Sequence, residues 1–320
     1  MSIFKTRFVT ENGIDLVILE DTSSQTSVAI APSNGAMLHR FEVHHRGELM
    51  NVVDHYPDEH TLTTQLETGG FKSAKLSPFV CRLNEGKYNF AGRKYHVEKF
   101  YLLRHALHGI IYDAAFEVVS HHGGEEFALV ELNYDYMGTD KGYPFIYRCM
   151  VRYELKTNNE LSVSTFITNP GEGLIPIADG WHPYFTFGGL IDDLQLEFQA
   201  IRKVEFDDEL IPTGELTPYD EFNSLKEIGD VFIDNCYELD FLTCQPMVVL
   251  RDPVKKIQLE IRPDKSYPYL QLYTPPTRRS IALENISSAP DAFNNDIGLS
   301  ILQPGEQKEF VTNFKITSII

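Results

Sequence analysis

Residues 145–156, FIYRCMVRYELK, decide the fold class of this chain. Apolar side chains occupy every second position of the segment: Phe145, Tyr147, Cys149, Val151, Tyr153 and Leu155. A more polar set of side chains alternates with them. Because successive side chains of a β-strand point to opposite faces, this period of two predicts a strand with one buried face.

The same alternation recurs in four shorter segments, at residues 128–136, 161–168, 194–198 and 257–261. Turn-forming residues punctuate the chain at 33–35, 84–86, 122–124, 169–171 and 303–305. No window of a dozen residues combines a helical stripe with capping residues, which disfavours an alternating α/β arrangement. The pattern predicts an all-β protein, a sandwich or a barrel, with one domain over residues 1–320.

Charge and composition exclude several classes of partner. The chain has 46 acidic and 28 basic residues and a formal net charge of -18, which repels phosphate backbones and anionic lipid surfaces. It has no apolar stretch of membrane-spanning length, and no apolar core follows Lys5 and Arg7 as in a secretory signal. We therefore expect a cytoplasmic protein that binds neither nucleic acid nor membranes. Four cysteines without paired spacing fit reduced thiols: Cys81, Cys149, Cys236 and Cys244.

Common catalytic motifs are missing from the sequence. It contains no Gly-rich dinucleotide fingerprint, no P-loop, no His-Glu-x-x-His pair and no Gly-x-Ser-x-Gly elbow. The pairs His44-His45 and His121-His122 would point to opposite faces of a strand and have no ligand-type company nearby. We interpret both pairs as solvated loop residues and expect no metal site.

The most unusual segment is Asp179-Gly180-Trp181-His182-Pro183-Tyr184-Phe185. A histidine directly before a proline is held in extended backbone, so the imidazole of His182 is presented by a rigid turn. Three aromatic rings flank it, and such rings stack on the apolar CH faces of sugars. The alternative is a buried core histidine at a strand end, because histidine is often buried.

Two further clusters carry chemically active side chains. Leu107-His108-Gly109 is one of them, and the other is the apolar run 281–283 that leads to Glu284. A carboxylate at the end of an apolar strand faces either solvent or a cleft, since burial without a partner costs several kcal/mol, on the order of the values for ionised groups. Taken alone, Glu284 is better interpreted as a solvated strand-end residue.

Together these clusters resemble the aldose 1-epimerase (galactose mutarotase-like) family. The His-Pro-Tyr-Phe segment, the Leu-His-Gly segment and a late glutamate before Pro-Asp-Ala at 290–292 stand in family order. The resemblance also includes Arg82 in Cys-Arg-Leu, Asp234 in Asp-Asn-Cys-Tyr and the closing Leu-Gln-Pro-Gly-Glu at 302–306. It extends over most of the chain from about Ser33 onward.

The resemblance implies a very large antiparallel β-sandwich that binds sugar on a concave sheet face. It implies an isomerase that interconverts the anomers of an aldose without a cofactor or metal. By family position Glu284 is the base, His182 the acid and His108 a positioning or secondary acid group, while Arg82 and Asp234 hold sugar hydroxyls. The pair would work as ionised Glu284 and protonated His182. A small sugar is the expected partner, and the protein is expected to be a monomer or a homodimer.

Three positions depart from the family pattern. The family has asparagine two residues before Leu-His-Gly, where this chain has His105, and asparagine after His-Pro-Tyr-Phe, where it has Thr186. The Asn-Arg-Ile of many galactose mutarotases is Cys-Arg-Leu here, with Cys81 in place of asparagine. These changes do not alter the reaction that the resemblance implies, but they do not support galactose as the particular substrate.

Three other functions remain open at this point. A hexose-6-phosphate 1-epimerase would need basic side chains for the phosphate, for which Arg278-Arg279 and Arg93-Lys94 are available. A non-catalytic carbohydrate-binding protein would share the fold, because fold does not fix function. A glycosidase or lyase would need a second carboxylate near Glu284, and Asp234 is the candidate.

Overall fold

The computed structural model describes residues 3–319. In that range, strands dominate, and the helical elements are short: α1 (Glu59–Gln65), α2 (Ala292–Asn295) and the 3-10 turns η1 (Asn84–Gly86) and η2 (Ile191–Asp193). The ladders between named strands are all antiparallel. The predicted all-β class with antiparallel pairing is confirmed.

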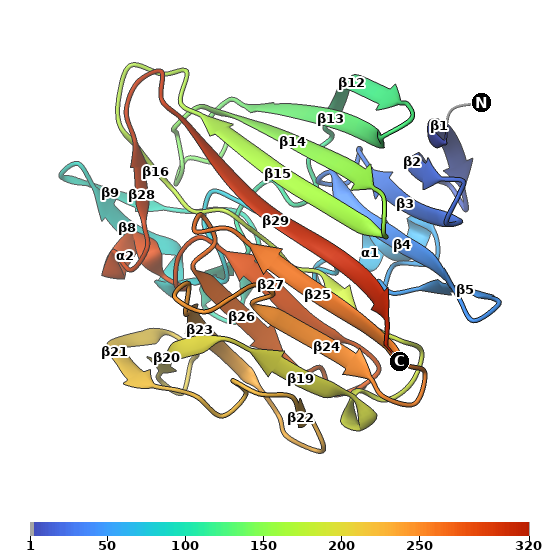
Figure 1. Cartoon of the computed structure of the whole chain (residues 1–320). Coiled ribbons are helices and arrows are strands. Elements are labelled where there is room, and N and C mark those ends of the chain that lie inside the picture. Colours follow the sequence, from blue (N-terminus) through green and yellow to red (C-terminus); the bar gives the residue numbers. More distant parts are fainter. Residues whose placement is uncertain (1–2, 320) are drawn as a thin grey trace.

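A nine-stranded sheet contains the segment that decided the fold class (Figure 1). In spatial order it consists of β12 (Glu117–Gly123), β13 (Phe127–Tyr136), β14 (Tyr147–Lys156), β15 (Glu160–Thr168), β29 (Gln307–Ser318), β25 (Ile257–Pro263), β24 (Val248–Asp252), β19 (Gln195–Phe198) and β22 (Lys226–Glu227). Along β14 every second side chain is buried, as the period of two predicts.

An eight-stranded sheet forms the second layer. Its order is β21 (Pro212–Pro218), β20 (Ala200–Phe206), β23 (Asp234–Leu239), β26 (Tyr269–Tyr273), β27 (Ile281–Ile286), β17 (Gly180–Trp181) and β6 (Lys75–Leu76), with β18 (Tyr184–Phe185) also paired to β27. The two-residue strands β17, β18 and β6 carry too few residues for a period to be seen in the sequence.

Smaller sheets complete the chain. The N-terminal part forms a five-stranded sheet of β1 (Phe4–Glu11), β2 (Ile14–Asp21), β3 (Thr26–Ala31), β4 (Met37–His45) and β5 (Glu48–Asn51). A three-stranded sheet joins β10 (Tyr101–Leu102), β11 (His105–Leu107) and β7 (Arg82–Leu83). Two further sheets have two strands each: the hairpin of β8 (Lys87–Phe90) and β9 (Arg93–His96), and the long-range pair of β16 (Ile175–Ile177) and β28 (Ser300–Leu302).

The nine-stranded sheet packs over one face of the eight-stranded sheet, which makes the fold a sandwich (Figure 1). Between the layers the rings of Phe185 and Phe314 lie 5.5 Å apart, and the Thr312 hydroxyl donates to the Asn285 side-chain oxygen at 2.7 Å. Strands β26 and β27 send alternate side chains, such as Leu283, into this core. Their other side chains point to the opposite face, where the candidate site lies.

One prediction about the histidine pairs is wrong. Both pairs lie in strands, in β4 and β12, and not in loops. His45 is buried, with its ring nitrogens 3.0 Å from the Ser318 hydroxyl and 2.8 Å from the Lys255 carbonyl oxygen. The alternation argument itself holds for the first pair, since His44 is exposed while its neighbour is buried.

A buried ion pair fixes the short strands to the sandwich. Lys75 and Asp179 are both fully buried, and the Lys75 ammonium lies 2.6 Å from the Asp179 carboxylate. The same ammonium donates to the Thr165 hydroxyl at 3.2 Å and lies 4.3 Å from the Trp181 ring centroid. The Tyr267 hydroxyl also donates to Asp179, at 2.6 Å. The pair therefore links β6 and the start of β17 to the nine-stranded sheet.

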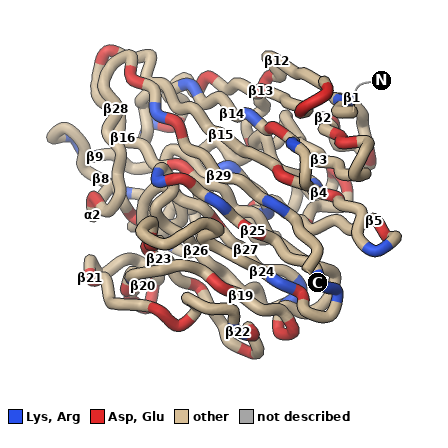
Figure 2. Tube along the Cα trace, in the orientation of Figure 1, with Lys and Arg blue, Asp and Glu red and all other residues tan. Residues whose placement is uncertain are grey.

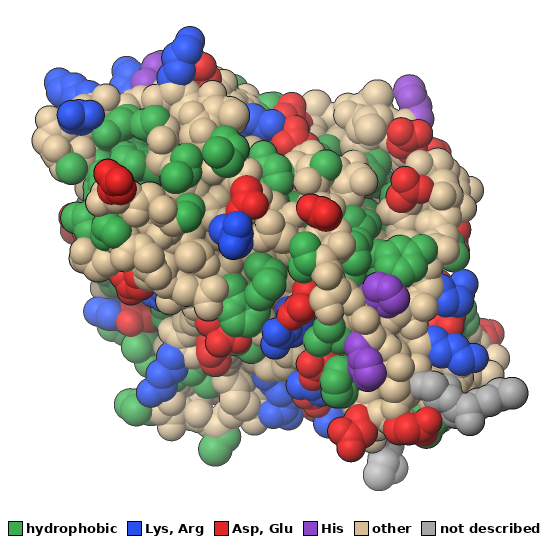
Figure 3. Space-filling view, turned by 90° about the horizontal axis from the view of Figure 1, so that it is seen from above, with side chains coloured by type: hydrophobic (Ala, Val, Ile, Leu, Met, Phe, Trp, Pro, Cys, Tyr) green, Lys and Arg blue, Asp and Glu red, His purple; other side chains and the backbone are tan. Residues whose placement is uncertain are grey.

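The surface carries charges of both signs. On the nine-stranded sheet, acidic and basic positions are interspersed (Figure 2), as in the cross-strand pairs Arg148–Asp135 and Arg152–Glu131. The face seen from above also mixes both signs with hydrophobic side chains (Figure 3). Among residues 3–319, no helix has the length and apolar character to cross a membrane.

Lys75→Met should strongly destabilise the protein, because it leaves the buried Asp179 carboxylate without its cation. We expect the free energy of unfolding, measured in urea at pH 7, to fall by about 3–5 kcal/mol. The matched control is Lys72→Met, which breaks the half-exposed 2.8 Å pair with Asp54 and should cost less than about 1 kcal/mol. Equal losses in the two variants would contradict the anchoring role of Lys75.

Candidate functional site

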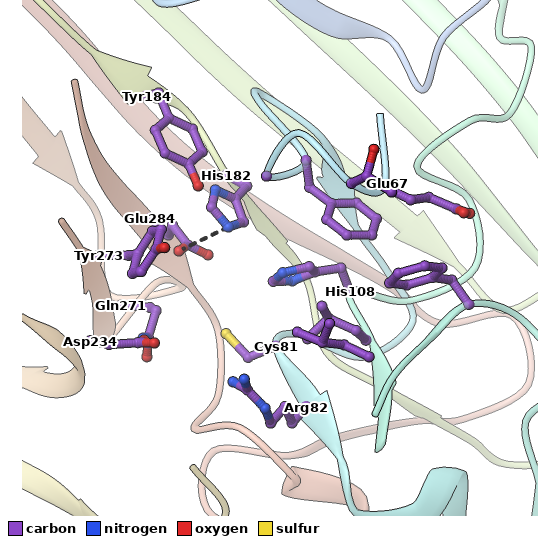
Figure 4. Close-up of a pocket in the computed structure, with 16 residues that line it drawn as sticks. Glu67, Cys81, Arg82, His108, His182, Tyr184, Asp234, Gln271, Tyr273 and Glu284 are labelled. Atoms are coloured by element: carbon purple, nitrogen blue, oxygen red, sulfur yellow. Dashed lines mark hydrogen bonds and ion pairs between the residues drawn. The ribbon is translucent and has the colours of Figure 1, made fainter. Parts of the chain in front are cut away.

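All five residues that the sequence nominated line one pocket: Arg82, His108, His182, Asp234 and Glu284. The pocket has a volume of about 430 Å³, within the range of small-molecule sites. Their side chains converge on it from separate elements (Figure 4). The sequence had placed these residues as much as 202 positions apart, from Arg82 to Glu284.

Three strands of the eight-stranded sheet supply the polar floor of the pocket. Gln271 of β26 lies directly opposite Glu284 of β27 in the antiparallel register, and its amide donates to the Asp234 carboxylate of β23 at 2.9 Å. Glu284 is only 1% exposed. Because cross-strand neighbours project to the same face, the sheet brings these groups together without help from any loop.

His182 lies between β17 and β18, and its backbone N–H and carbonyl oxygen both form hydrogen bonds. Its N–H donates to the Ala74 carbonyl at 3.1 Å, and its own carbonyl accepts from the Ser73 N–H at 2.8 Å. The imidazole stacks on the Tyr184 ring, with centroids 5.0 Å apart. Its Nε2 atom lies 3.3 Å from Oε1 of Glu284. The turn thus presents the imidazole to the carboxylate, as the His-Pro segment predicts.

His108 enters the pocket on a strained turn. It has a φ of 61°, as a non-glycine residue in the left-handed region, where such conformations cluster at functional sites. Its N–H donates to the Cys81 carbonyl at 2.9 Å. The next residue must be glycine, since a Cβ on Gly109 would lie 2.2 Å from the Ser77 carbonyl oxygen. The His108 ring meets the His182 ring edge-on, at 4.8 Å between centroids.

Arg82 lines the same pocket from β7, opposite Leu107 of β11. Its guanidinium has no hydrogen bond or ion pair to the other described side chains, so its donors are free for a ligand. Among residues 3–319, Arg82 is the only lysine or arginine that lines this pocket. An unpaired guanidinium beside Asp234 is suited to holding a hydroxyl between a donor and an acceptor.

Burial pushes the acid-base pair toward its neutral forms. Desolvation lowers the pKa of His182 to about 3. Desolvation, followed by the nearby Asp234 charge, raises the pKa of Glu284 well above its usual value. Burial thus favours a protonated carboxyl and a neutral imidazole, whereas the resemblance implied the ionised pair. The two arrangements carry the same number of protons and differ only in which atom holds one of them.

Several buried polar atoms of the pocket have no hydrogen-bond partner: Nδ1 of His108, Nδ1 of His182, Oε1 of Gln271 and Oε2 of Glu284. Buried polar atoms are nearly always satisfied in folded proteins. These four atoms can therefore form hydrogen bonds with a polar ligand in the pocket. Among residues 3–319, no group of three or more histidine, cysteine or acidic side chains is placed to hold a metal ion.

Sequence reasoning missed part of the lining. Gln271 is the polar position in an otherwise apolar strand, Tyr-Leu-Gln-Leu-Tyr, and that interruption was a usable signal. Phe71, Phe100 and Glu67 also line the pocket. They lie in loops around β6, α1 and β10, and no periodicity or motif distinguishes them in the sequence.

The three departures from the family pattern differ in position. Cys81 lines the pocket, and burial raises the pKa of its thiol. His105 accepts the Glu85 N–H at 3.1 Å and does not line the pocket. The Thr186 hydroxyl donates to a backbone carbonyl at 2.8 Å, outside the pocket. Only Cys81 therefore presents a different group to a bound ligand.

The chain is similar to known proteins in sequence and in fold. The model of the aldose 1-epimerase family matches residues 17–315. The uncharacterized protein YihR of Escherichia coli strain K12 is 24% identical over 272 residues, which make up 82% of each chain. A galactose 1-epimerase from Lactobacillus acidophilus NCFM superposes with a TM-score of 0.83 at 20% identity, over 99% of this chain and 100% of that one. A galactose mutarotase-like protein from Clostridium acetobutylicum superposes with a TM-score of 0.85 at 16% identity, over 99% of both chains.

Glu284→Gln should stabilise the folded protein at neutral pH. A raised folded-state pKa means that ionisation of Glu284 disfavours the fold as pH rises above its ordinary value of 4.5. The neutral amide removes that cost, so we expect a gain of about 1–3 kcal/mol at pH 8 and a much smaller gain at pH 4. Urea unfolding at the two pH values measures the difference. A gain that does not depend on pH would contradict this account.

Proposed function

The chain belongs to the aldose 1-epimerase family, and on that premise we propose that it interconverts the α and β anomers of a free aldose. The observation that carries the proposal is the 3.3 Å contact between His182 Nε2 and Glu284 Oε1, buried at the floor of the pocket. A hemiacetal opens when one group takes the proton of the anomeric hydroxyl and another protonates the ring oxygen. A carboxylate beside an imidazole supplies both.

The proposed reaction begins with the sugar bound over the pair. Glu284 takes the proton from the anomeric hydroxyl, whose oxygen forms the carbonyl bond as the bond from C1 to the ring oxygen breaks. His182 gives its proton to the departing ring oxygen. Rotation about the C1–C2 bond exposes the other face of the aldehyde, and both proton transfers then run in reverse. The enzyme returns to its starting state, and the sugar has changed anomer.

Sugar binding would move the pair into its working state. A hydroxyl that donates to the Glu284 carboxylate stabilises the ionised form, and so does closer approach of the free guanidinium of Arg82. The proton then resides on His182, a transfer across the 3.3 Å contact. His108, whose ring meets that of His182, would position the imidazole or act as a secondary acid.

The structure gives less support to the phosphate-sugar alternative. Arg278 is engaged with the Asp192 carboxylate and with the Gly229 carbonyl at 2.6 Å. Arg93 and Lys94 lie on the β8–β9 hairpin and do not line the pocket. Arg82 alone would face a phosphate, with acidic Asp234 beside it. A free aldose fits this charge distribution better.

The glycosidase alternative is also less well supported. Asp234 does line the pocket, but its carboxylate accepts the Gln271 amide, while the direct partner of Glu284 is an imidazole. A glycosidase would place its two carboxyl groups on either side of the scissile bond. A carbohydrate-binding protein without catalysis would share this pocket, and only an activity assay separates it from an epimerase.

Mutarotation is followed by the optical rotation of freshly dissolved α-glucose, α-galactose and other aldoses. We expect wild type to accelerate the approach to equilibrium with at least one sugar, and Glu284→Gln to be slower by about a hundredfold or more. Glu48→Gln, at an exposed position of β5, serves as the control and should match wild type. If no free aldose is accelerated, glucose 6-phosphate is tested next. An unchanged rate with that sugar as well would favour the carbohydrate-binding protein without catalysis.

The rate should depend on pH in a bell shape. The working pair holds one proton in total. It binds a second proton below the lowered pKa of His182, about 3, and loses its only proton above the raised pKa of Glu284. Below the window no base remains, and above it no acid remains. We therefore expect kcat/KM to fall at both ends, with a plateau across weakly acidic to neutral pH. An unchanged rate from acid into alkaline pH would contradict the pair.

A further inference from the structure

Residues 287–291 directly follow β27, the strand that carries Glu284, and they contact other elements of the site. At the start of this segment, the Ser287 N–H donates to the Asp179 carbonyl at 2.8 Å, and the Ser287 hydroxyl accepts the Asp179 N–H at 2.9 Å. Asp179 stands three residues before His182. The segment therefore ties the strand of the carboxylate to the stretch of chain that carries the imidazole.

Asp291, at the end of the same segment, makes the corresponding connection to Arg82. Its N–H donates to the Arg82 carbonyl at 2.7 Å. Its carboxylate accepts the Asn84 N–H at 2.8 Å. The two contacts hold the chain on both sides of Leu83, so Asp291 fixes the backbone of β7 directly.

The carboxylate of Asp291 does not serve the helix that it precedes. Asp291 is the N-cap residue of α2, and an aspartate at this position usually accepts an N–H of the first helical turn. Within the described part of the chain, it caps no N–H of α2 and accepts instead from Asn84, 207 positions away, and from the Asn294 amide at 2.7 Å. The residue is 6% exposed and has a φ of 58°. A buried carboxylate on strained backbone thus serves the contact with β7.

Arg82 depends on such backbone contacts for its position. Its side chain reaches into the pocket (Figure 4), where the guanidinium makes no hydrogen bond or ion pair with the other described side chains. Strand β7 is only two residues long and pairs with β11, where Arg82 lies opposite Leu107. Since no partner holds the guanidinium, its place in the pocket follows the backbone of β7. Small displacements of a binding group weaken catalysis strongly.

We propose that Asp291 is a positioning residue, which acts through Arg82 and holds its guanidinium where it binds the sugar. The proposal rests on the proposed function, in which Arg82 contacts sugar hydroxyls and stabilises the Glu284 carboxylate. Asp291 itself does not line the pocket, so it acts without touching the sugar. It follows that Asp291 influences the reaction only while the Arg82 guanidinium is present.

Asp291→Gly removes the carboxylate and adds no strain, because glycine adopts a φ of 58° freely. We expect kcat/KM for mutarotation, with the aldose that wild type accelerates most, to fall about tenfold. Asp291→Asn keeps a carbonyl acceptor and tolerates the left-handed backbone, so it should stay within about threefold of wild type. A loss in Asp291→Asn as large as in Asp291→Gly would contradict the role of the acceptor.

The matched control is Asp296→Gly. Asp296 is an exposed aspartate at the other end of α2, and its φ of 60° is nearly that of Asp291. This variant makes the same substitution in the same backbone conformation without removing a contact to β7. Its kcat/KM should equal that of wild type.

A double-mutant cycle with Arg82→Met separates positioning from a general effect on the fold. In the Arg82→Met background, Asp291→Gly should change kcat/KM by less than about twofold, because its effect passes through the missing guanidinium. A tenfold fall in both backgrounds would overturn the proposal.

Asn84→Pro tests the same contact from its other end if Asp291→Gly does not fold. Proline removes the donating N–H and is tolerated at the first residue of a helical turn. The preceding Leu83 already has the extended backbone, at φ −114° and ψ 118°, that a following proline requires. Asn84→Pro should lower kcat/KM in the Arg82 protein and leave it unchanged in the Arg82→Met background. Any other pattern overturns the proposal.

The failure of this proposal is distinguishable from failure of the epimerase proposal. Wild-type turnover with an unchanged rate in Asp291→Gly would overturn the role of Asp291 and still support the epimerase. If wild type turns over no sugar, the epimerase proposal fails, and the same cycle is measured as affinity for glucose and galactose by calorimetric titration. Weaker binding in Asp291→Gly, absent in the Arg82→Met background, then supports positioning. Equal losses in both backgrounds, or no binding by wild type, overturn it.

Discussion

The ion pair between Lys75 and Asp179 is the interaction on which the site depends. Asp179 stands three residues before His182, and Lys75 follows Ala74, whose carbonyl accepts the His182 N–H. Both strands that carry these residues, β17 and β6, are only two residues long. Strands this short form too few hydrogen bonds to fix the position of the His182 side chain precisely. The buried charges supply that precision by locking both strands to the sandwich.

The site itself is held in an electrostatically unfavourable condition. Glu284 and His182 are buried without enough polar partners to satisfy them, and His108 adds a left-handed backbone. Each feature costs stability, typically about 1–3 kcal/mol. The extensive core between the two large sheets offsets these costs. Burial keeps the proton of the pair on Glu284, so in the proposed mechanism hydrogen bonds from the bound sugar must stabilise the carboxylate before the proton resides on His182.

Sequence reasoning predicted the long strands and the five nominated residues for different reasons. β13, β14 and β15 bury one face each, and therefore leave a period of two in the sequence. The nominated residues belong to short motifs whose family order is visible without a structure. Glu67 and Phe71 could not be predicted, since long-range packing brings their loops to the pocket. The protonation state of the Glu284–His182 pair could not be predicted either, because it depends on how deeply the fold buries the two side chains.

The origins of the two pocket walls differ in a way that bears on how such proteins diversify. Glu284, Gln271 and Asp234 come from adjacent strands in a fixed ladder, where a change at one position disturbs its neighbours. Phe71 and Glu67 come from connecting segments outside the large sheets, where insertions and substitutions are better tolerated. Evolution can therefore remodel the loop wall while leaving the strand wall intact. A lineage of these proteins could acquire new sugars by loop drift alone, with the inherited chemistry unchanged.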